Sequence, residues 1–196
     1  MQKLFLPLIV ASITLTASCS SQTAGNGVKA NYDFDASKYK YNTQTDLVKA
    51  FIATLSAGDT SNMQQYAITE EVISYAATLM DKDDTIPVEQ KVEKARKELN
   101  GKIKRAWGPT LRNLVKTMSD DNVDLSTSTI TIDSLPSKQF KSCNYILKGK
   151  VTVSILTKDQ KPHKLTIYDL LKVKNKWFIL GPKWEWNDHG ISNRPN

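Results

Sequence analysis

The chain contains few of the residues from which catalytic and metal sites are most often built. Its 196 residues include two cysteines and two histidines. With so few cysteines the sequence offers no disulfide framework of the kind on which small secreted domains depend. The histidines are poorly placed for catalysis, because His163 follows Pro162 at a hairpin end and His189 lies in the C-terminal tail. We therefore expect neither a catalytic residue nor a metal site.

The short sequence motifs of common enzyme classes are missing as well. There is no HExxH, CxxC, P-loop or GxSxG pattern, which excludes the common metalloproteases, zinc ribbons, nucleotide-binding proteins and hydrolases. The Ser-x-x-Lys match at residues 37–40 lacks the Ser-Asp-Asn and Lys-Thr-Gly elements that accompany it in the enzymes that use it. These absences favour a protein that is not an enzyme and that needs no cofactor.

Long apolar runs are rare too, and the one exception lies at the N-terminus. Residues 4–17 are fourteen consecutive uncharged residues that follow Lys3. This run is too short for the hydrocarbon core of a bilayer, which is about 30 Å thick and needs roughly 20 helical residues. A positive residue followed by a short apolar run is typical of a signal peptide, which we expect at residues 1–18.

The residues before Cys19 resemble a bacterial lipobox. In a lipobox, small residues such as Ala17 and Ser18 precede a cysteine that is lipidated and becomes the mature N-terminus. Thr16 stands where the lipobox usually has Leu, and an ordinary cleavable signal is the alternative. The resemblance implies a lipoprotein that carries palmitate or a similar acyl chain on Cys19. Ser20 is similar to the residue that follows the cysteine in outer-membrane lipoproteins, which implies the periplasmic face of the outer membrane.

Composition divides the chain after the signal peptide into a tether, a domain and a tail. Residues 20–27 are small and polar, which is typical of a flexible tether. We expect a lipidated tether at residues 19–41, a globular domain at 42–186 and a C-terminal tail at 187–196. The net charge of +7 is a modest excess, and outside the cytoplasm it does not indicate a nucleic-acid partner. The membrane, reached through the lipid, is an expected partner.

A helical period begins near residue 43. Apolar residues at positions 47, 48, 51, 52 and 55 form one stripe of an amphipathic helix. Thr43 with Asp46 resembles a capping box, and Gly58 is well placed to end the helix in a left-handed conformation. Three further helical segments are predicted: a short one from Asp59 or Thr60 through Tyr66, one from Thr69, and a longer one from Pro87 that Gly108 and Pro109 should break or kink.

Beyond residue 124 the apolar period becomes two, which is typical of strands with one buried and one wet face. Val151, Val153 and Ile155 alternate with Thr152 and Ser154. We expect about four antiparallel strands, at residues 129–135, 145–155, 165–173 and 177–180, with a tight hairpin at residues 174–176. We expect one outer sheet face to hold Lys148, Lys150, Lys172 and Lys174. This face would be either a docking surface for anionic lipid or polysaccharide, or simply solvated. Helices followed by antiparallel strands predict an α+β domain.

Two parts of the chain resemble the NTF2-like, or cystatin-like, domains of bacterial lipoproteins. Residues 48–67 are similar to the opening of these domains, which consists of a helix, a Gly-Asp turn and a second short helix. Residues 169–179 are similar to their last hairpin. The resemblance implies N-terminal helices packed on a curved antiparallel sheet that forms a cone, often with a small apolar ligand at its mouth. The aromatic candidates for the lining of such a pocket are Tyr66, Tyr75, Trp107, Tyr145 and Trp177.

These observations predict a membrane-anchored envelope lipoprotein with a non-enzymatic binding domain. Its partner would be a small apolar ligand or an envelope protein. The alternative is an NTF2-like enzyme of the isomerase or hydrolase type, which would need an acid or a histidine deep in the pocket. A pocket lined by aliphatic and aromatic residues would favour binding.

Overall fold

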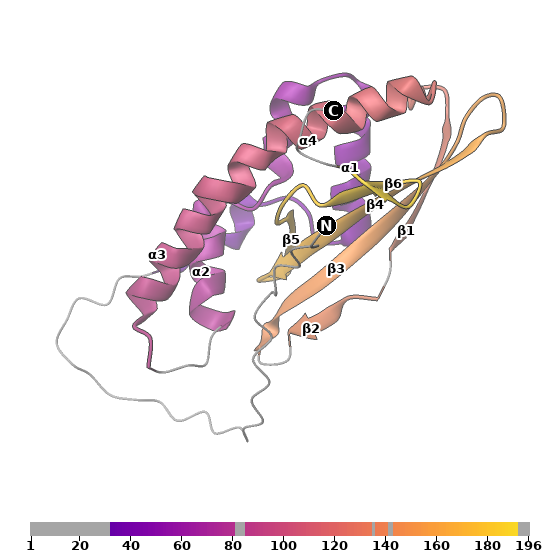
Figure 1. The fold of residues 1–196 in the computed structure, drawn as a ribbon. Coiled ribbons are helices and arrows are strands. Elements are labelled where there is room, and N and C mark those ends of the chain that lie inside the picture. The colour runs from indigo at the N-terminus through magenta and orange to yellow at the C-terminus, as the bar shows by residue number, and fades with distance from the viewer. Residues whose placement is uncertain (1–31, 81–84, 135, 141–142, 192–196) are drawn as a thin grey trace. The chain divides into compact units, whose positions relative to one another are not determined.

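The computed structural model describes residues 32–80, 85–134, 136–140 and 143–191, which all belong to one unit of the fold. Within this unit the helices come first along the chain and the strands follow. The domain is therefore α+β with an antiparallel sheet, as the sequence predicts. In Figure 1, α3 and α4 run end to end as one long helix beside the sheet. Within the described residues, no helix has both the length and the apolar character needed to span a bilayer.

The first α-helix, α1 (Gln44–Ser56), has the caps that its sequence predicts. The Thr43 hydroxyl accepts a hydrogen bond from the Asp46 backbone N–H at 3.0 Å and donates one to the Asp46 carboxylate at 2.7 Å. At the other end Gly58 adopts a φ of +71°, and its N–H donates to the Leu55 carbonyl. A residue with a Cβ would be strained in this left-handed conformation, so glycine is the residue that ends the helix with least cost.

Most of the remaining helices lie close to their predicted positions. They are the 3₁₀ helices Ala36–Lys38 and Thr60–Tyr66, α2 (Glu70–Met80), α3 (Val88–Glu98) and α4 (Lys104–Asp120). Of the break or kink predicted at Gly108 and Pro109, the break is wrong, because both residues lie inside α4. A π-helical turn at Leu99–Ile103 interrupts the regular helix earlier in the chain. Trp107 and Leu111, on either side of the proline, are buried in the core. Their packing outweighs the hydrogen bond that Pro109 cannot donate.

The strands form one antiparallel sheet. They are β1 (Thr129–Ser134), β2 (Lys138–Phe140), β3 (Cys143–Leu156), β4 (Pro162–Val173), β5 (Lys176–Ile179), β6 (Trp184–Trp186) and β7 (His189–Gly190). The order is β1-β3-β4-β6-β7, while β2 also pairs with β3 and β5 with β4. The described part of the sheet thus has seven strands, where the sequence predicts about four. The additional strands β2, β6 and β7 are two or three residues long, too short for a two-residue period to be visible.

The central strand β3 shows the alternation that the sequence predicts. Val151 and Val153 are fully buried, whereas Ser154 is exposed. The two valines belong to a large hydrophobic cluster that also contains residues of α1 and α4. Trp184 and Trp186 of β6 belong to the same cluster, so the aromatic end of the chain closes the core.

The face of the sheet opposite the large cluster, here called the outer face, is covered at one end. Leu170 opposes Ile179 and the next residue, Leu171, opposes Phe178, so these two pairs point to opposite faces. The first pair belongs to the large cluster, whereas the second belongs to a smaller cluster that includes residues of α2. The prediction of one wet face is therefore correct around Ser154 and wrong at the β4–β5 hairpin, where α2 packs.

The predicted outer face of four lysines is not formed. Lys148 opposes Leu171. Lys172 belongs to the adjacent pair, in which it opposes Leu147. Successive residues of a strand point to opposite faces, so Lys148 and Lys172 lie on opposite sides of the sheet. Lys174 lies in the two-residue turn between β4 and β5 instead. The four lysines named in the prediction therefore do not form one surface.

The packed part of the chain begins before residue 42, where the sequence places the domain boundary. Phe34 is buried in the smaller cluster. The Lys174 ammonium lies 4.9 Å from the centroid of the Phe34 ring and 4.6 Å from that of Tyr75, and it donates to the Phe34 carbonyl at 3.0 Å. Residues 32–41 thus pack against the domain, and at the other end β7 pairs with β6 inside the expected tail.

Candidate functional site

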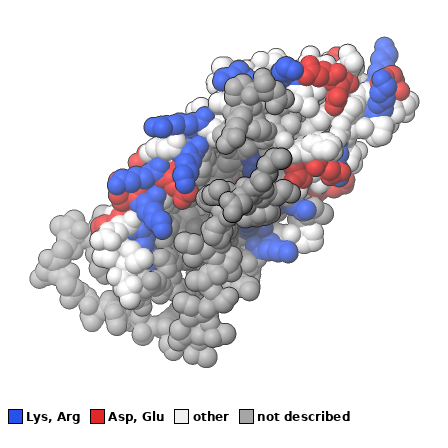
Figure 2. Space-filling view, in the orientation of Figure 1, with Lys and Arg blue, Asp and Glu red and all other residues white. Residues whose placement is uncertain are grey.

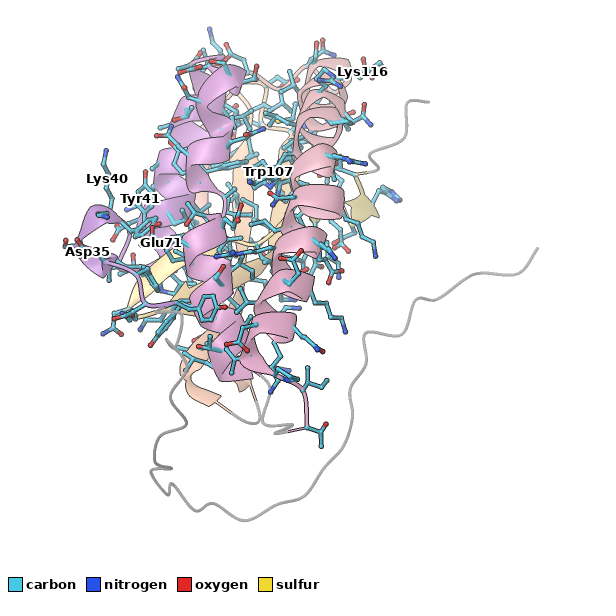
Figure 3. The ribbon with its side chains drawn as sticks, turned by 90° about the vertical axis from the view of Figure 1, so that its left-hand side faces the viewer. Asp35, Lys40, Tyr41, Glu71, Trp107 and Lys116 are labelled. Carbon is cyan, nitrogen blue, oxygen red and sulfur yellow. The ribbon has the colours of Figure 1, made fainter. Side chains whose placement is uncertain are left out.

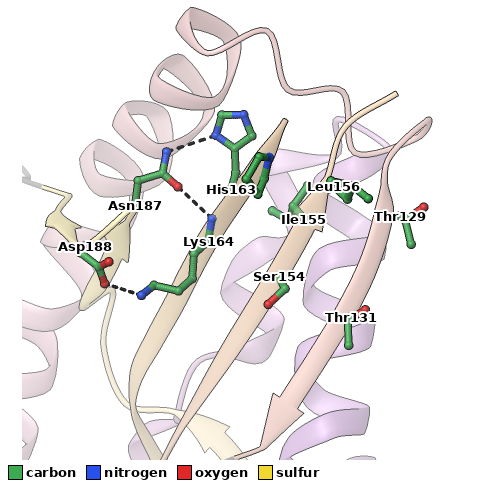
Figure 4. Close-up of a pocket in the computed structure, with 10 residues that line it drawn as sticks. Thr129, Thr131, Ser154, Ile155, Leu156, His163, Lys164, Asn187 and Asp188 are labelled. Atoms are coloured by element: carbon green, nitrogen blue, oxygen red, sulfur yellow. Dashed lines mark hydrogen bonds and ion pairs between the residues drawn. The ribbon is translucent and has the colours of Figure 1, made fainter. Parts of the chain in front are cut away.

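An open groove crosses the outer face where β1, β3 and β4 lie side by side (Figure 4). Two rows of opposing residues line it, Thr131, Ser154 and Lys164 in one and Thr129, Leu156 and Pro162 in the next. The lining is completed by Ile155, His163, Asn187 and Asp188. The groove has a volume of about 570 Å³. Because Val153 points into the large cluster, the neighbouring Ser154 points into the groove.

One wall of the groove is a two-residue turn between β6 and β7. Asn187 and Asp188 connect Trp186 to His189 and have φ values of 48° and 67°, as both central positions of a type I′ turn require. The Asp188 carboxylate pairs with Lys164 Nζ at 2.6 Å, and the Asn187 side-chain oxygen accepts a hydrogen bond from the Lys164 N–H at 2.9 Å. The turn is thus fixed to β4 by a side-chain contact and a backbone contact.

His163 borders the groove, but its imidazole is engaged by the fold. The ring stacks on Trp186 with 5.4 Å between centroids, and its side chain is 10% exposed. Asn187 Nδ2 donates to His163 Nδ1 at 3.1 Å, and Asp121 Oδ2 lies 3.7 Å from the same nitrogen. Because Nδ1 accepts, the neutral ring carries its proton on Nε2. That nitrogen is buried and has no hydrogen-bond partner among the described residues.

The end of α4 is joined to this corner of the domain. Asp121 follows the last residue of α4, and its Oδ2 accepts a hydrogen bond from Trp186 Nε1 at 2.6 Å. The same oxygen lies 3.5 Å from Asn187 Nδ2. The helix end, the start of β4 and the β6–β7 turn therefore hold one another in place, and the groove wall is a fixed surface.

The side chains that line the groove are suited to hydrogen bonding rather than to proton transfer. The hydroxyls of Thr129, Thr131 and Ser154 belong to exposed residues, and each hydroxyl can donate and accept. Lys164 and Asp188 are the charged residues of the lining, and they are paired with each other. Such a lining suits an uncharged polar partner, since the paired charges attract neither a cation nor an anion strongly.

A second polar cluster lies farther along the outer face, around Tyr168. The Tyr168 hydroxyl donates a hydrogen bond to Glu185 Oε2, and this bond, helped by burial, raises the pKa of Tyr168 to about 12. The ammonium groups of Lys150 and Lys183 lie 5.5 Å and 5.4 Å from the centroid of the same ring. Both lysines interact favourably with the electron-rich ring face, and the cluster is organised by its own contacts.

The aromatic residues expected to line an internal pocket are split between two places. Tyr66, Trp107 and Trp177 are buried in the large cluster, Tyr75 packs against the smaller one, and the side chain of Tyr145 lies outside the described residues, as does the lipidation candidate Cys19. Among the described residues, neither the groove nor a second one along α3 is lined by any of these aromatics. The structure thus places three of the five together, as tightly packed core residues.

Sequence reasoning missed the groove because its residues come from four separate segments. The alternation of Val153 and Ser154 predicts which side chains point outward, but the pairing of β1 with β3 is a long-range contact. The one local signal is the Asn187-Asp188 pair, since these residue types favour the left-handed conformations of a tight turn.

Comparison with protein-family models, with characterised proteins and with solved structures finds no match. The part of the chain that the structure describes also has no group of three or more His, Cys, Asp or Glu side chains placed to hold a metal ion. The chemistry of the groove itself is therefore the basis for a functional proposal.

Proposed function

We propose that this protein is a lipoprotein anchored through Cys19 at the periplasmic face of the outer membrane, and that its domain binds a segment of an envelope protein without catalysing a reaction. The observation that carries the proposal is the pairing within the groove. Lys164 is paired with Asp188 and His163 is held by Asn187, so the polar side chains available to a partner are chiefly hydroxyls. Hydroxyl groups suit recognition through hydrogen bonds.

The open form and mixed polarity of the groove favour a protein segment over a small apolar ligand. Beside the hydroxyls, Leu156 is 36% exposed and Pro162 is also exposed. A protein segment offers polar groups to the hydroxyls and apolar side chains to this patch. A small apolar ligand needs a concave apolar pocket, whereas the buried aromatics Tyr66, Trp107 and Trp177 are occupied with packing the core.

An NTF2-like cone is the fold that we propose to accompany this function. The order of a helix, a Gly58-Asp59 turn and a 3₁₀ helix supports it, as does the closing β4–β5 hairpin. In such a domain the helices pack on one face of a curved sheet, and α1 and α4 contribute to the large cluster in this way. The end of the opposite face that α2 does not cover would then be free to receive a partner in the groove.

Photo-crosslinking in intact cells tests this proposal. A photoreactive amino acid is placed at Thr131, which is exposed in the groove, or at Lys49, which is exposed on α1 and serves as the matched control. We expect a discrete crosslinked protein product from position 131 and none from position 49. The protein with the photoreactive residue at position 131 is also made with Ser154→Arg, which puts a long charged side chain into the groove. This variant should give no crosslinked product, although the amount of the lipoprotein in the cells is unchanged.

Two outcomes of the crosslinking experiment would contradict the proposal. Equal products from positions 131 and 49 would show that contact is not confined to the groove. A product that persists with Ser154→Arg would place the partner elsewhere on the outer face. Mass spectrometry of the product identifies the partner, and an adduct with a small molecule instead of a protein would favour the ligand alternative.

A further inference from the structure

We propose that a basic face on the α3–α4 helix docks the domain onto the anionic phospholipid headgroups of the membrane that carries its anchor. The 33 residues from 88 to 120 contain nine Lys and Arg and four Asp and Glu. They carry a net charge of +5, out of +7 for the whole chain. This one helix therefore holds most of the positive excess of the protein.

The basic face is defined by seven exposed side chains of this helix. They are Lys94, Lys97, Lys102, Lys104, Arg105, Arg112 and Lys116. The side of the helix that holds Trp107 and Leu114 is buried in the large cluster. In Figure 2, Lys and Arg side chains follow α3 and α4 across the visible face of the domain. In Figure 3, Trp107 lies toward the neighbouring helices while Lys116 lies at the outer rim of α4.

Local ion pairs leave much of this charge available. Three lysines have an acidic neighbour four residues away, with N–O distances of 3.6 Å for Lys97–Glu93, 3.9 Å for Lys102–Glu98 and 2.6 Å for Lys116–Asp120. All of these side chains are more than half exposed, and such surface pairs are weak. Among the described residues, no ion pair engages the other four members, Lys94, Lys104, Arg105 and Arg112.

The form of the basic face matches an extended anionic surface. A helix of this length extends for roughly 50 Å at 1.5 Å per residue. Gly101 lies between the basic residues of α3 and those of α4, and a Cβ there would meet no atom within 4 Å. The helix backbone is thus open to close approach at its centre. A long row of positive charges suits a surface that bears many negative charges better than a single charged ligand.

The choice of a membrane as the partner rests on the proposed anchor. Twelve residues lie between Cys19 and Tyr32, the first described residue. A chain of this length spans at most about 45 Å. An anchored domain would therefore stay close to the headgroups, and the tether would supply a high effective concentration for a weak electrostatic contact. A basic patch added to a lipid anchor also strengthens membrane attachment.

Vesicle co-sedimentation tests the docking surface without the anchor. The protein used comprises residues 20–196, which lack Cys19 but keep every residue of both hydrophobic clusters and the whole compact unit. Vesicles with about one-third phosphatidylglycerol are compared with vesicles of phosphatidylcholine alone. We expect at least about a hundredfold stronger binding to the anionic vesicles at low salt, and a contrast that fades as salt is added.

Two triple variants with the same charge change locate the surface. The first, Lys94→Gln with Arg105→Gln and Arg112→Gln, should weaken binding to anionic vesicles about tenfold. The matched control, Lys40→Gln with Lys49→Gln and Lys158→Gln, changes one exposed lysine on α1 and two in loops, and should weaken binding less than about threefold. Urea midpoints of both variants report folding. If the first variant is misfolded, the single variant Arg105→Gln repeats the comparison against Lys49→Gln.

Three results would overturn the docking proposal. They are the absence of binding to anionic vesicles at low salt, an equal loss in both triple variants, and stronger binding to nucleic acid or to an acidic polysaccharide than to the vesicles. Because the protein tested carries no lipid, failure of Cys19 to be lipidated in cells would leave the vesicle result unchanged. The two proposals can therefore fail independently.

Discussion

The side-chain amide of Gln44 occupies the space directly above Gly149. A Cβ on Gly149 would lie 2.5 Å from Gln44 Nε2 and 2.8 Å from Gln44 Cδ. Gln44 is the first residue of α1 and is 8% exposed, while Gly149 lies in the middle of β3. The start of the helix can therefore rest against the strand because position 149 has no side chain.

This contact predicts an effect that depends on both residues. Gly149→Ala should lower the free energy of unfolding by about 1 kcal/mol, because the far end of the buried Gln44 side chain must shift to make room for the added Cβ. In a Gln44→Ala background the same substitution should cost less than about 0.5 kcal/mol, since the crowded amide is gone. Urea unfolding of the four proteins measures the coupling. An equal cost in both backgrounds would show that Gln44 is not what excludes a side chain.

The alternation along β3 predicts a contrast between neighbouring residues. Val153 is fully buried, so Val153→Ala removes packed methyl groups and should cost about 1 to 3 kcal/mol of stability. Thr152 is half-buried on the outer face, and Thr152→Ala should cost under about 0.5 kcal/mol. Urea midpoints of the two variants decide the matter. A larger loss for Thr152→Ala would mean that the outer face is buried, for example in a dimer through the sheet.

The hydrogen bond from Tyr168 to Glu185 predicts an unusual titration. It raises the pKa of Tyr168 to about 12, from an ordinary value of 10.0. The folded state favours the neutral phenol, so this contact stabilises the fold fully below pH 10 and its contribution is lost as the pH rises through 12. Ultraviolet absorbance should show one tyrosine ionising near pH 12. This ionisation step should be missing in Tyr168→Phe and should move to lower pH in Glu185→Gln. A curve unchanged by Glu185→Gln would exclude the carboxylate as the cause.

Two glycines predict opposite effects of the same substitution. Gly101 lies in the π-helical turn with open space around it, so Gly101→Ala should raise the free energy of unfolding by about 0.5 to 1 kcal/mol. Gly58, with a φ of +71°, serves as the control, and Gly58→Ala should lower it by about 1 kcal/mol. Thermal unfolding of both variants provides the comparison. A loss of stability at Gly101 would indicate that the π-helical turn itself requires glycine.

Helix α1 could be predicted in detail because its signals are local. Thr43 and Asp46 form the cap within four residues, and Gly58 ends the helix through its own backbone conformation. The sequence predicts a break or a kink at Pro109, and the helix does not break there, because burial of Trp107 in the folded domain outweighs the local cost of a proline. Local chemistry therefore predicts the ends of elements better than it predicts interruptions inside a packed helix.

The candidate sites show a similar division. The outward direction of Ser154 is visible in the sequence, but the groove also needs β1 and the β6–β7 turn, which reach it through pairings distant in sequence. The charge of the basic face is visible as well, yet the favourable spacing of Glu93 with Lys97 predicts only a solvated helix face. Joining α3 to α4 through the π-helical turn is what makes the basic residues one continuous face.

The proposed lipid on Cys19 underlies both the proposed location and the proposed membrane contact, and metabolic labelling with radioactive palmitate tests for it directly. The wild-type protein and Cys143→Ala, which changes the only other cysteine of the sequence, should both incorporate label and sediment with membranes. Cys19→Ala should incorporate none and should leave the lipid-anchored fraction, because each buried CH₂ contributes about 0.8 kcal/mol to membrane attachment. Label in Cys19→Ala, or its absence from the wild-type protein, would contradict the anchor.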